Sequence, residues 1–387
     1  MFTIAIFGST GSIGTCLIDI IKKNKKKFKI ELLTANKNYK KLIKQTELYK
    51  VKNIIITNKE SYLIAKKILK NRNVNIYNDF NSLRKIFKNK KIDYSMSAIS
   101  GFEGLKPTLD MIKFTKTIAI ANKESIICGW CLIKKKLDRY KTKFIPIDSE
   151  HFSIWSLLGG IKCNNLEKVY ITASGGPFRK YPLKQFKNIT QKKALQHPNW
   201  SMGKKISIDS ATMMNKVFEI IEAKKIFNLK YDQLEILIHP QSYLHAIVKF
   251  NNGLTKLLIH DTNMTIPIFN SIYSSHENNL KSNSLDINTL SNLKLEFVDK
   301  KRFPVIKIIN KLIDRDSLFE TVIVSANDEL VNRFLKNEIK FTDISDSLLK
   351  IINLNEFKKL KLIKPKNVEE VRKLAQYVSL KINTISV

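Results

Sequence analysis

The acidic residues Asp148 and Glu150 are the first candidates for chemistry, because together they could hold a divalent cation. They follow an apolar stretch that reaches Pro146, which predicts the end of a strand. Side chains two positions apart on a strand point to one face. Two carboxylates held close repel each other unless a cation joins them, and their hard oxygens suit Mg²⁺ or Mn²⁺. A solvated strand end would have the same sequence, so both interpretations stay open.

A helix predicted over residues 211–227 offers a second group of polar side chains. Asp209 or Ser210 is its predicted N-cap. Three polar residues, spaced four and then three apart, lie on one stripe of this helix: Asn215, Glu219 and Glu222. The stripe spans about 10 Å, the length of a small sugar phosphate, so one helix could hold a phosphate near its start and a metal further along. An exposed charged face is the alternative for either glutamate alone.

Two loops could complete such a site. The segment Ser174–Phe178 contains Ser-Gly-Gly after a predicted strand and could bring N–H and hydroxyl groups to a phosphate. The segment His197–Gly203 places Trp200 and Met202 in a loop punctuated by Pro and Gly, which is typical of a lid over an active site. A surface loop that Trp200 anchors in the core is the alternative.

A glycine-rich segment, Gly8–Gly14, follows the first predicted strand and opens the first predicted helix. A dinucleotide-binding loop requires this context, because its glycines let backbone N–H groups approach the pyrophosphate and the helix N-terminus favours negative charge. The second predicted strand ends at Ala35 without the Asp or Glu that binds a ribose 2′-hydroxyl. Lys37, flanked by Asn36 and Asn38, instead suits a 2′-phosphate. The sequence therefore predicts NADPH, with a plain glycine-rich turn as the alternative.

The elements that would position these residues form an α/β protein. Residues 1–146 alternate strand-like runs with helical patterns, which predicts a Rossmann-like, doubly wound parallel sheet. We expect an α+β catalytic domain over residues 147–274, a linker over 275–300 and a C-terminal helical domain over 301–387. The predicted strands are Thr3–Phe7, Lys29–Thr34, Asn53–Thr57, Tyr94–Ala98, Thr117–Ala121, Val169–Ala173, Glu235–Ile238 and His245–Phe250. The predicted C-terminal helices are Val305–Ile313, Leu318–Leu335, Ile344–Ile352 and Val368–Ile382.

Composition narrows the choice of partners. The chain has 387 residues and a formal net charge of +34, which raises the question of nucleic acid. Nearly all of the excess is Lys spread along the chain, whereas Arg, the residue suited to base and phosphate forks, is scarce, so we expect no nucleic-acid partner. Four cysteines make no disulfide framework, and no apolar run of about eighteen residues predicts a membrane span. With no targeting segment before the first strand, we expect a cytoplasmic protein that binds no membrane.

In order and spacing, these motifs resemble those of the 1-deoxy-D-xylulose 5-phosphate reductoisomerase family, and the resemblance covers the whole chain. It rests on Gly8–Gly14, Asn122–Ser125, Asp148–His151, Ser174–Phe178, His197–Gly203, Lys205–Lys216 and His239–His245. The resemblance implies a homodimer that rearranges 1-deoxy-D-xylulose 5-phosphate to a branched aldehyde. NADPH would then reduce the aldehyde to 2-C-methyl-D-erythritol 4-phosphate, a step of the non-mevalonate isoprenoid precursor pathway. A divalent cation would stabilise the enediolate formed during the rearrangement.

The resemblance also implies roles for single residues. It places NADPH on Thr10, Gly11, Ser12, Ile13, Asn36, Lys37, Asn38, Asn122, Glu124 and Gly203. It implies Mg²⁺ or Mn²⁺ on Asp148, Glu150 and Glu219, which together with Lys123 form the catalytic set. It implies contacts with the ketose phosphate from Lys123, Ser149, Glu150, Ser174, His197, Trp200, Ser210, Asn215, Lys216 and Glu219. The chain departs from the family at Asn36, where Gly is usual, and over Asn263–Pro267, where Asp and Arg are usual.

Two rival classes of protein fit the sequence less well. A semialdehyde dehydrogenase also opens with a glycine loop of this spacing, but it needs a catalytic Cys, and none of the four cysteines lies in a setting typical of a nucleophile. A basic nucleic-acid-binding protein with a degenerate enzyme fold would have lost its metal ligands, whereas all three acidic candidates are present.

Overall fold

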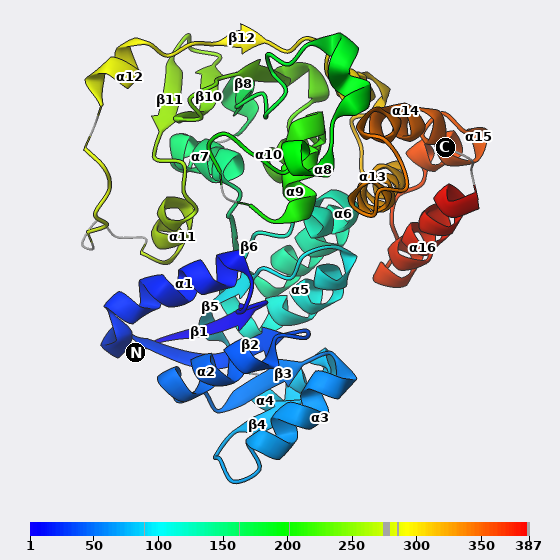
Figure 1. The fold of residues 1–387 in the computed structure, drawn as a ribbon. Helices are drawn as coiled ribbons and strands as arrows, with labels where there is room; N and C mark the ends of the chain where they lie inside the picture. Colours follow the sequence, from blue (N-terminus) through cyan, green and yellow to red (C-terminus); the bar gives the residue numbers. More distant parts are fainter. Residues whose placement is uncertain (89, 162, 201, 274–278, 285, 385–387) are drawn as a thin grey trace. The chain divides into compact units, whose positions relative to one another are not determined.

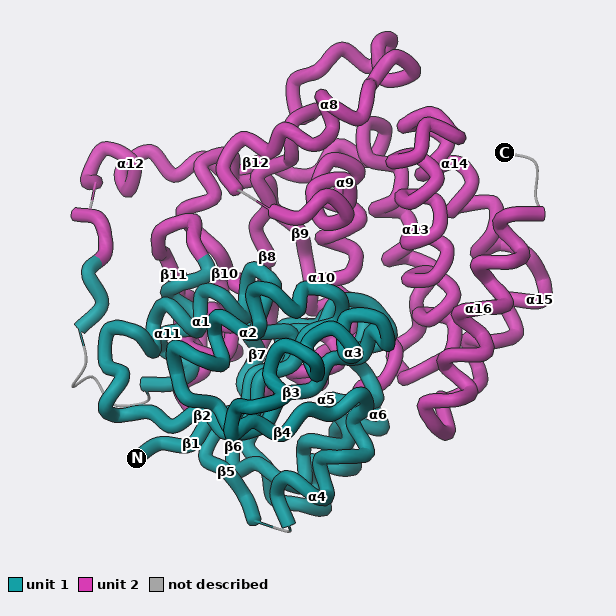
Figure 2. The backbone as a smooth tube through the Cα atoms, turned by 60° about the horizontal axis from the view of Figure 1, so that its bottom comes forward, with its two compact units in different colours: residues 1–125, 131–148, 264–281 teal, residues 126–130, 149–263, 282–387 magenta. Residues whose placement is uncertain are grey.

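The computed structural model describes residues 1–387 apart from residues 89, 162, 201, 274–278, 285 and 385–387. The described chain forms two compact units, which Figure 2 colours separately. The first comprises residues 1–125, 131–148 and 264–281, and the second comprises residues 126–130, 149–263 and 282–387. The domain boundaries predicted at residues 146, 274 and 300 remain a prediction.

A parallel sheet forms the centre of the first unit, with the strand order β4-β3-β2-β1-β5-β6-β7 (Figure 1). Its strands are β1 (Phe2–Phe7), β2 (Phe28–Ala35), β3 (Asn53–Ile56), β4 (Asn75–Tyr77), β5 (Ile92–Ser97), β6 (Thr115–Ile120) and β7 (Lys143–Pro146). The order reverses between β1 and β5, and such a switch point is where doubly wound sheets bind ligands. The predicted Rossmann-like sheet is confirmed, although β4 is too short to show a sequence pattern.

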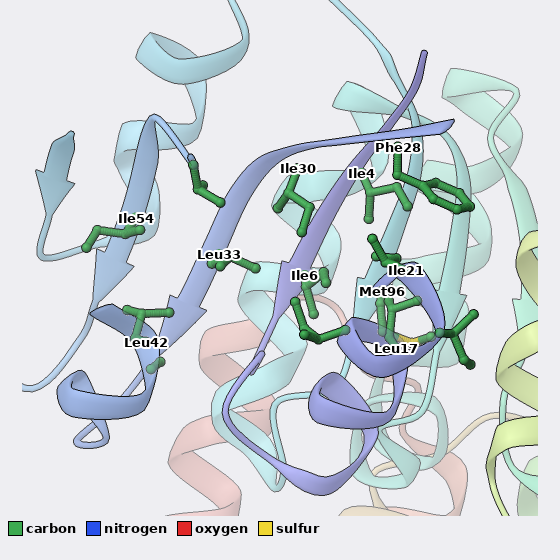
Figure 3. Packing of buried hydrophobic residues seen from close by; sticks show 14 of the residues in the cluster. Ile4, Ile6, Leu17, Ile21, Phe28, Ile30, Leu33, Leu42, Ile54 and Met96 are labelled. Atoms are coloured by element: carbon green, nitrogen blue, oxygen red, sulfur yellow. The ribbon is translucent and has the colours of Figure 1, made fainter. Parts of the chain in front are cut away.

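Helices cover the strands of this sheet and bury their apolar residues. They are α1 (Ser12–Lys23), α2 (Tyr39–Tyr49), α3 (Lys59–Ile68), α4 (Leu83–Phe87), α5 (Leu105–Met111), α6 (Lys123–Tyr140) and α11 (Thr265–Ile272). Leu17 and Ile21 of α1 share one buried cluster with Ile4 and Ile6 of β1 (Figure 3). Because β1 is covered, its residues from Ile4 onward are buried without alternation, as expected for a parallel strand.

The second unit contains a mixed sheet in the order β11-β10-β8-β9-β12. Its strands are β8 (Leu166–Ala173), β9 (Leu234–Ile238), β10 (Leu244–Phe250), β11 (Thr255–Ile259) and β12 (Glu296–Phe297). Only the pair β8 and β9 is parallel among these neighbours. Between β7 and β9 the described chain forms the helices α7 (Ser149–Leu158), α8 (Gln191–Ala194), α9 (Lys204–Thr212) and α10 (Met214–Phe227).

The C-terminal part of the second unit is helical, as the sequence predicts. It contains α13 (Phe319–Leu335), α14 (Phe341–Ile351), α15 (Asn355–Lys358) and α16 (Val368–Thr384). The predicted helix over 305–313 is a 3₁₀ helix over Pro304–Lys311. The segment predicted as a linker contains α12 (Ile287–Ser291) and β12, and its residues 275–278 and 285 lie outside the described residues. Across the described ranges, no helix is both long and apolar enough to cross a membrane.

Two local predictions are wrong at positions that matter for the site. Glu150 is not on a strand end but in the first turn of α7, where a carboxylate is stabilised by the partial positive charge of the helix N-terminus. The helix predicted over 211–227 is two helices, because Met213 has φ +67° and ends α9. Asp209 and Ser210 therefore lie inside α9 and are not N-caps. Residues other than Gly rarely adopt this left-handed conformation, so the sequence gives no signal for the break.

Candidate active site

The glycine loop follows β1 and opens α1 at the switch point of the sheet, as predicted. Gly8 has φ +78°, and a Cβ there would lie 2.6 Å from the carbonyl oxygen of Ala98. A Cβ at Gly14 would lie 2.4 Å from the carbonyl oxygen of Gly8. The absence of a side chain at Gly8 therefore lets the loop approach the chain after β5, and its absence at Gly14 lets α1 approach the loop. Thr10, Gly11 and Ser12 of this loop line a cavity of about 450 Å³.

Two side chains of α2 hold the glycine loop, and sequence reasoning missed both. The Gln45 amide accepts from the Ser9 hydroxyl at 2.8 Å and donates to the Ser9 carbonyl oxygen at 3.0 Å. Lys41 Nζ donates to the Thr10 carbonyl oxygen at 3.2 Å and to Thr15 Oγ1 at 2.7 Å. These contacts join positions 26 to 36 residues apart, so no local pattern reveals them.

The end of β2 presents the residues predicted to select the cofactor. Asn38 is the N-cap of α2, and its Oδ1 accepts from the backbone N–H of Lys41 at 3.2 Å. The Asn36 amide donates to Thr57 Oγ1 at 2.9 Å, and Asn36 does not have a positive φ, so the family's usual Gly is not required there. Lys37 between them is exposed. An exposed lysine beside a helix N-terminus can bind a phosphate.

Replacing Lys37 by Glu should therefore change the choice of cofactor. We expect kcat/KM for NADPH to fall about 10- to 100-fold, since a hydrogen bond between charged groups contributes about 1.5–3 kcal/mol and repulsion replaces it. The value for NADH should stay nearly unchanged. Lys40→Glu, at an exposed position of the same helix start, is the control. Steady-state assays with both cofactors test this, and a wild type that uses NADH as efficiently as NADPH would refute the assignment.

The carboxyl ends of β6 and β7 bring Lys123 and Asp148 together. Asn122 is a buried N-cap of α6: its Oδ1 accepts from the backbone N–H of Ser125 at 2.5 Å, and its Nδ2 donates to the carbonyl oxygen of Gly101 at 2.9 Å. The next residue, Lys123, forms an ion pair with the Asp148 carboxylate. Because β6 and β7 are parallel neighbours, the residues after them meet at one edge of the sheet, where α/β proteins bind ligands.

In the second unit, Glu150 of α7 and Glu219 of α10 converge on one ammonium group. Lys216 Nζ pairs with Oε1 of Glu150 and lies 2.6 Å from Oε2 of Glu219. Burial lowers the pKa of Lys216, but the two carboxylates outweigh this effect and hold its pKa above the ordinary value. Asn215 also donates to Glu219, and the Ser149 hydroxyl donates to Glu150 at 2.6 Å. Glu219 is 1% exposed, so the exposed-face interpretation is wrong.

Glu222 and His151 form a second buried group between the same two helices. His151 Nε2 donates to the carbonyl oxygen of Glu219 at 2.9 Å, and its Nδ1 lies 3.9 Å from Oε2 of Glu222. Both side chains are buried, so the exposed-face interpretation of Glu222 is wrong as well. Sequence reasoning missed His151, although it ends the Asp148–His151 motif. An imidazole and a carboxylate suit a softer cation than Mg²⁺.

Ser174 and His197 form a hydrogen-bonded pair after β8. His197 Nδ1 accepts from the backbone N–H groups of Asn199 at 3.2 Å and Trp200 at 3.0 Å. The ring proton therefore sits on Nε2, which donates to Ser174 Oγ at 3.2 Å. Ser174 Oγ also accepts from the backbone N–H of Gly176 at 3.0 Å. With its oxygen accepting two bonds, the Ser174 hydroxyl can donate its own proton to an anion.

The His197 ring should remain neutral across the physiological range. Burial, and then the charge of Lys216, lower the pKa of His197 to about 4. As the pH falls from 8 to 5, an ordinary histidine would gain a proton near pH 6.5, whereas His197 should keep its Nε2–H tautomer. Imidazole ¹H–¹⁵N spectra, with His197→Asn to assign the signals, test this expectation. A His197 signal that titrates near pH 6.5 would be inconsistent with the hydrogen bonds described above.

The predicted lid loop rests on the second sheet. The Asn199 amide donates to the carbonyl oxygen of Pro240 and to Ser242 Oγ, both at 2.7 Å. The Trp200 ring meets the buried His245 ring edge-on, with centroids 6.2 Å apart and an interplanar angle of 79°. Trp200 is only half-buried, which fits a lid better than a core anchor. Residue 201 of the predicted loop lies outside the described residues.

The Ser-Gly-Gly loop lies on α9. Gly176 has φ +64°, and a Cβ there would lie 2.8 Å from the carbonyl oxygen of Ser210. This close approach brings Ser174 and Ser210 into one neighbourhood, next to the start of α10. Gly203 is the N-cap of α9, and Glu124 lies in the first turn of α6. Apart from Gly203, the predicted cofactor residues lie in the first unit together with Lys123 and Asp148, and all other predicted site residues lie in the second.

Comparisons with known proteins point to one family along most of the chain. Three family models match: 1-deoxy-D-xylulose 5-phosphate reductoisomerase at residues 4–129, its C-terminal domain at residues 144–227, and a further DXP reductoisomerase C-terminal domain at residues 260–379. The 1-deoxy-D-xylulose 5-phosphate reductoisomerase of Pelagibacter ubique (strain HTCC1062) is 70% identical over 100% of both chains. That of Bacteroides fragilis (strain YCH46) is 38% identical over 89% of this chain and 88% of its own.

Solved structures show the same similarity. The Zymomonas mobilis reductoisomerase, in complex with NADPH, has a TM-score of 0.88 and 32% identity, over 98% of this chain and 97% of that one. A DOX-P reductoisomerase in complex with NADPH, fosmidomycin and magnesium has a TM-score of 0.87 and 28% identity, over 100% of both chains.

A glycine loop at the switch point of a doubly wound sheet, followed by Lys37 after the second strand, defines an NADP-dependent oxidoreductase. The carboxylate cluster on α7 and α10 adds a site that a simple dehydrogenase does not need. Together with the family models and relatives that match, these features identify the family within this class of enzyme: the chain belongs to the 1-deoxy-D-xylulose 5-phosphate reductoisomerase family. The predicted family is confirmed.

Proposed function

We propose that the residues brought together in the two units carry out the family's reaction. This reaction is the NADPH-dependent conversion of 1-deoxy-D-xylulose 5-phosphate to 2-C-methyl-D-erythritol 4-phosphate in the isoprenoid precursor pathway. The observation that supports it best is that two carboxylates, the half-buried Glu150 and the buried Glu219, share one cationic group. Rearrangement of a ketose carbon skeleton passes through an enediolate, so it needs a centre that binds a cation beside the substrate.

Asp148, Glu150 and Glu219 would hold Mg²⁺ or Mn²⁺. Only Ser149 separates Asp148 from Glu150, and consecutive Cα atoms lie about 3.8 Å apart, so the chain itself keeps the third carboxyl near the pair. Glu150 and Glu219 each have a carboxylate oxygen within 4.8 Å of one of the other, and both already form ion pairs with the Lys216 ammonium group. Oxygen donors suit a hard cation. When bound, the cation would supply Lewis acidity at the substrate oxygens.

NADPH would lie on the glycine loop of the first unit. The turn Thr10–Ile13 would bind the pyrophosphate through backbone N–H groups, and Lys37, with Asn36 and Asn38, would bind the 2′-phosphate. NADPH in the structure of the Zymomonas mobilis relative supports this assignment. The other cofactor contacts in the proposal are Asn122, Glu124 and Gly203. Because Oδ1 of Asn122 caps α6 and its Nδ2 donates to the carbonyl oxygen of Gly101, Asn122 would contribute by fixing its turn.

The substrate's phosphate end would bind where β8, α9 and α10 meet. Lys216 would supply charge there, and neutral His197 would donate through Nε2. Ser174, Ser210 and Asn215 would supply the remaining donors. The oxygenated carbons would face Lys123, Ser149 and Glu150, beside the cation. Trp200 would cover the site and exclude water during hydride transfer.

A homodimer is part of this proposal. The two edge strands of the second sheet carry exposed apolar side chains: Leu257 of β11 is 46% exposed and Phe297 of β12 is 76% exposed. Exposed apolar residues on sheet edges are sites where chains associate. The use of Mn²⁺ and a cytoplasmic location remain predictions.

An assay of product formation tests the proposed reaction. The enzyme should oxidise NADPH in the presence of 1-deoxy-D-xylulose 5-phosphate and Mg²⁺, and mass spectrometry should find 2-C-methyl-D-erythritol 4-phosphate in equal amount. Omitting the ketose, or chelating the cation, should each stop the oxidation. NADPH consumption without this product, or turnover that is unaffected by chelation, would contradict the proposal.

A further inference from the structure

A buried polar contact joins the C-terminal helices to the helix that carries Ser210. Asp209 of α9 accepts at Oδ1 from the Asn327 amide of α13 at 2.7 Å, and at Oδ2 from Lys205 Nζ at 2.9 Å. Lys205 also lies 2.9 Å from the Asp328 carboxylate. Asp209 is 1% exposed and Asn327 is 0% exposed. This contact links α9 to a helix more than a hundred residues later, as the 118-residue separation of the bonded pair shows.

The chemistry of this contact indicates a role other than stability. Removing a carboxylate and an amide from water costs free energy, and an apolar pair of similar volume often stabilises a protein as well or better. A hydrogen bond between two buried groups, in contrast, fixes how far one helix can slide past another. The pair Asp209 and Asn327 therefore sets the register of α9 against α13.

That register determines where the phosphate-binding residues lie. Ser210 is in the same turn of α9 as Asp209. Three residues later, Met213 turns the chain into α10, and Thr212 Oγ1 accepts from the backbone N–H of Met214 at 3.3 Å to begin that helix. Lys216 follows in the first turn of α10. A slide of α9 would therefore move Ser210 and the start of α10 together.

A second contact from α13 holds the other end of α10. Lys225, 2% exposed in its side chain, lies 3.4 Å from the Glu320 carboxylate of α13 and 2.8 Å from Asp316 just before it. The helix α13 is thus bonded to α9 before the break at Met213 and to α10 near its end. Both contacts lie in the second unit, and along the chain they flank Ser210, Lys216 and Glu219.

We propose that Asn327 is a positioning residue, which through Asp209 holds Ser210 and the start of α10 in place for the phosphate end of the substrate. This inference rests on the proposed function of the site. It gives the C-terminal helical part of the chain an influence on substrate affinity, although none of its residues is proposed to touch the substrate.

Four variants of the full-length enzyme test this role by separating affinity from stability. Asn327→Leu should raise KM for 1-deoxy-D-xylulose 5-phosphate by about 10- to 100-fold, because a shift of about 1 Å in a binding group has effects of this size. The Kd for NADPH should not change. The apolar pair Asp209→Leu/Asn327→Leu should keep the melting temperature of the wild type but not its KM. The exchanged pair Asp209→Asn/Asn327→Asp should recover most of the affinity, and Asn332→Leu, exposed on the same helix, is the control.

The outcomes distinguish the alternatives. If Asn327→Leu and the apolar pair both bind substrate like the wild type, the positioning role is refuted, whatever happens to their stability. If Asn327→Leu does not fold, the exchanged pair decides: a folded protein with an unrestored KM overturns the inference. If the wild type does not convert the ketose phosphate at all, the proposed function fails instead.

Discussion

Glu219→Gln is expected to lower the affinity for Mn²⁺ and the turnover rate by about 100-fold or more. Changing a residue that only orients a metal ligand already lowers metal affinity or activity by about 10- to 100-fold, and changing a ligand should lower them further. The substitution removes one negative oxygen ligand and nearly preserves the shape of the side chain. Glu219 is buried and its carboxylate faces Lys216 and Asn215, so a water molecule cannot easily take the place of the lost ligand, and it would not restore the negative charge. Asp148→Asn and Glu150→Gln, each as a single variant, should likewise lower both the Mn²⁺ affinity and the turnover rate. Binding of NADPH should survive in all three variants, because the glycine loop is a separate element: Glu150 and Glu219 lie in the other unit, and Asp148 follows a different strand of the first sheet.

Glu222→Gln is the matched control for this prediction. Glu222 lies on the same helix, is equally buried and would undergo the same chemical change, but its carboxylate faces His151. We expect a milder effect on Mn²⁺ affinity, measured by electron paramagnetic resonance titration, and on turnover. If Glu219→Gln keeps the affinity and rate of the wild type while Glu222→Gln loses both, the cation binds at the imidazole group and the assignment of ligands is wrong.

Gly14→Ala is expected to lower the affinity for NADPH by about 100-fold or more, because a shift of about 1 Å in a binding group can have such an effect. The added Cβ would lie 2.4 Å from the backbone of Gly8, so the loop must move away from α1. Displaced N–H groups would no longer point at the pyrophosphate. Fluorescence titration with NADPH measures the loss, and binding of Mn²⁺ should be unaffected.

Gly11→Ala provides the comparison within the same loop. Gly11 has φ −75°, and a Cβ there would have only the Gly8 carbonyl oxygen nearby, at 3.4 Å. We therefore expect Gly11→Ala to weaken NADPH binding far less than Gly14→Ala. Equal losses in the two variants would mean that close packing between strand and helix is not what makes Gly14 necessary.

The parts of the site that the sequence predicts are those with a local signal. The glycine loop, the strands of the first sheet and the position of Lys37 after β2 follow from spacing and apolar patterns within about ten residues. The break at Met213 has no such signal, because a methionine in left-handed conformation depends on the packing around it. The start of α7 at Ser149 has no local signal either, because the apolar stretch before it is typical of a strand that continues.

Contacts between distant segments account for the rest of what was missed. The hydrogen bonds between Gln45 and Ser9 and between Asn327 and Asp209 join elements that only the folded chain brings together. The burial of Glu222 is of this kind as well: its spacing along α10 fits an exposed stripe equally well, and only the packing of α7 against this helix decides. Resemblance to a family supplied roles for residues inside its motifs, such as Ser174 and His197, whereas Gln45 and Asn327 required the structure.

Anomalous diffraction from crystals grown with Mn²⁺ tests the central claim most directly, because it locates the cation among the candidate ligands. We predict one peak per chain, within about 2.5 Å of carboxylate oxygens of Asp148, Glu150 and Glu219. Lys216 should then have moved away from at least one of the two glutamates that it bridges here. A peak between His151 and Glu222, or a peak that touches neither Glu150 nor Glu219, would contradict the account.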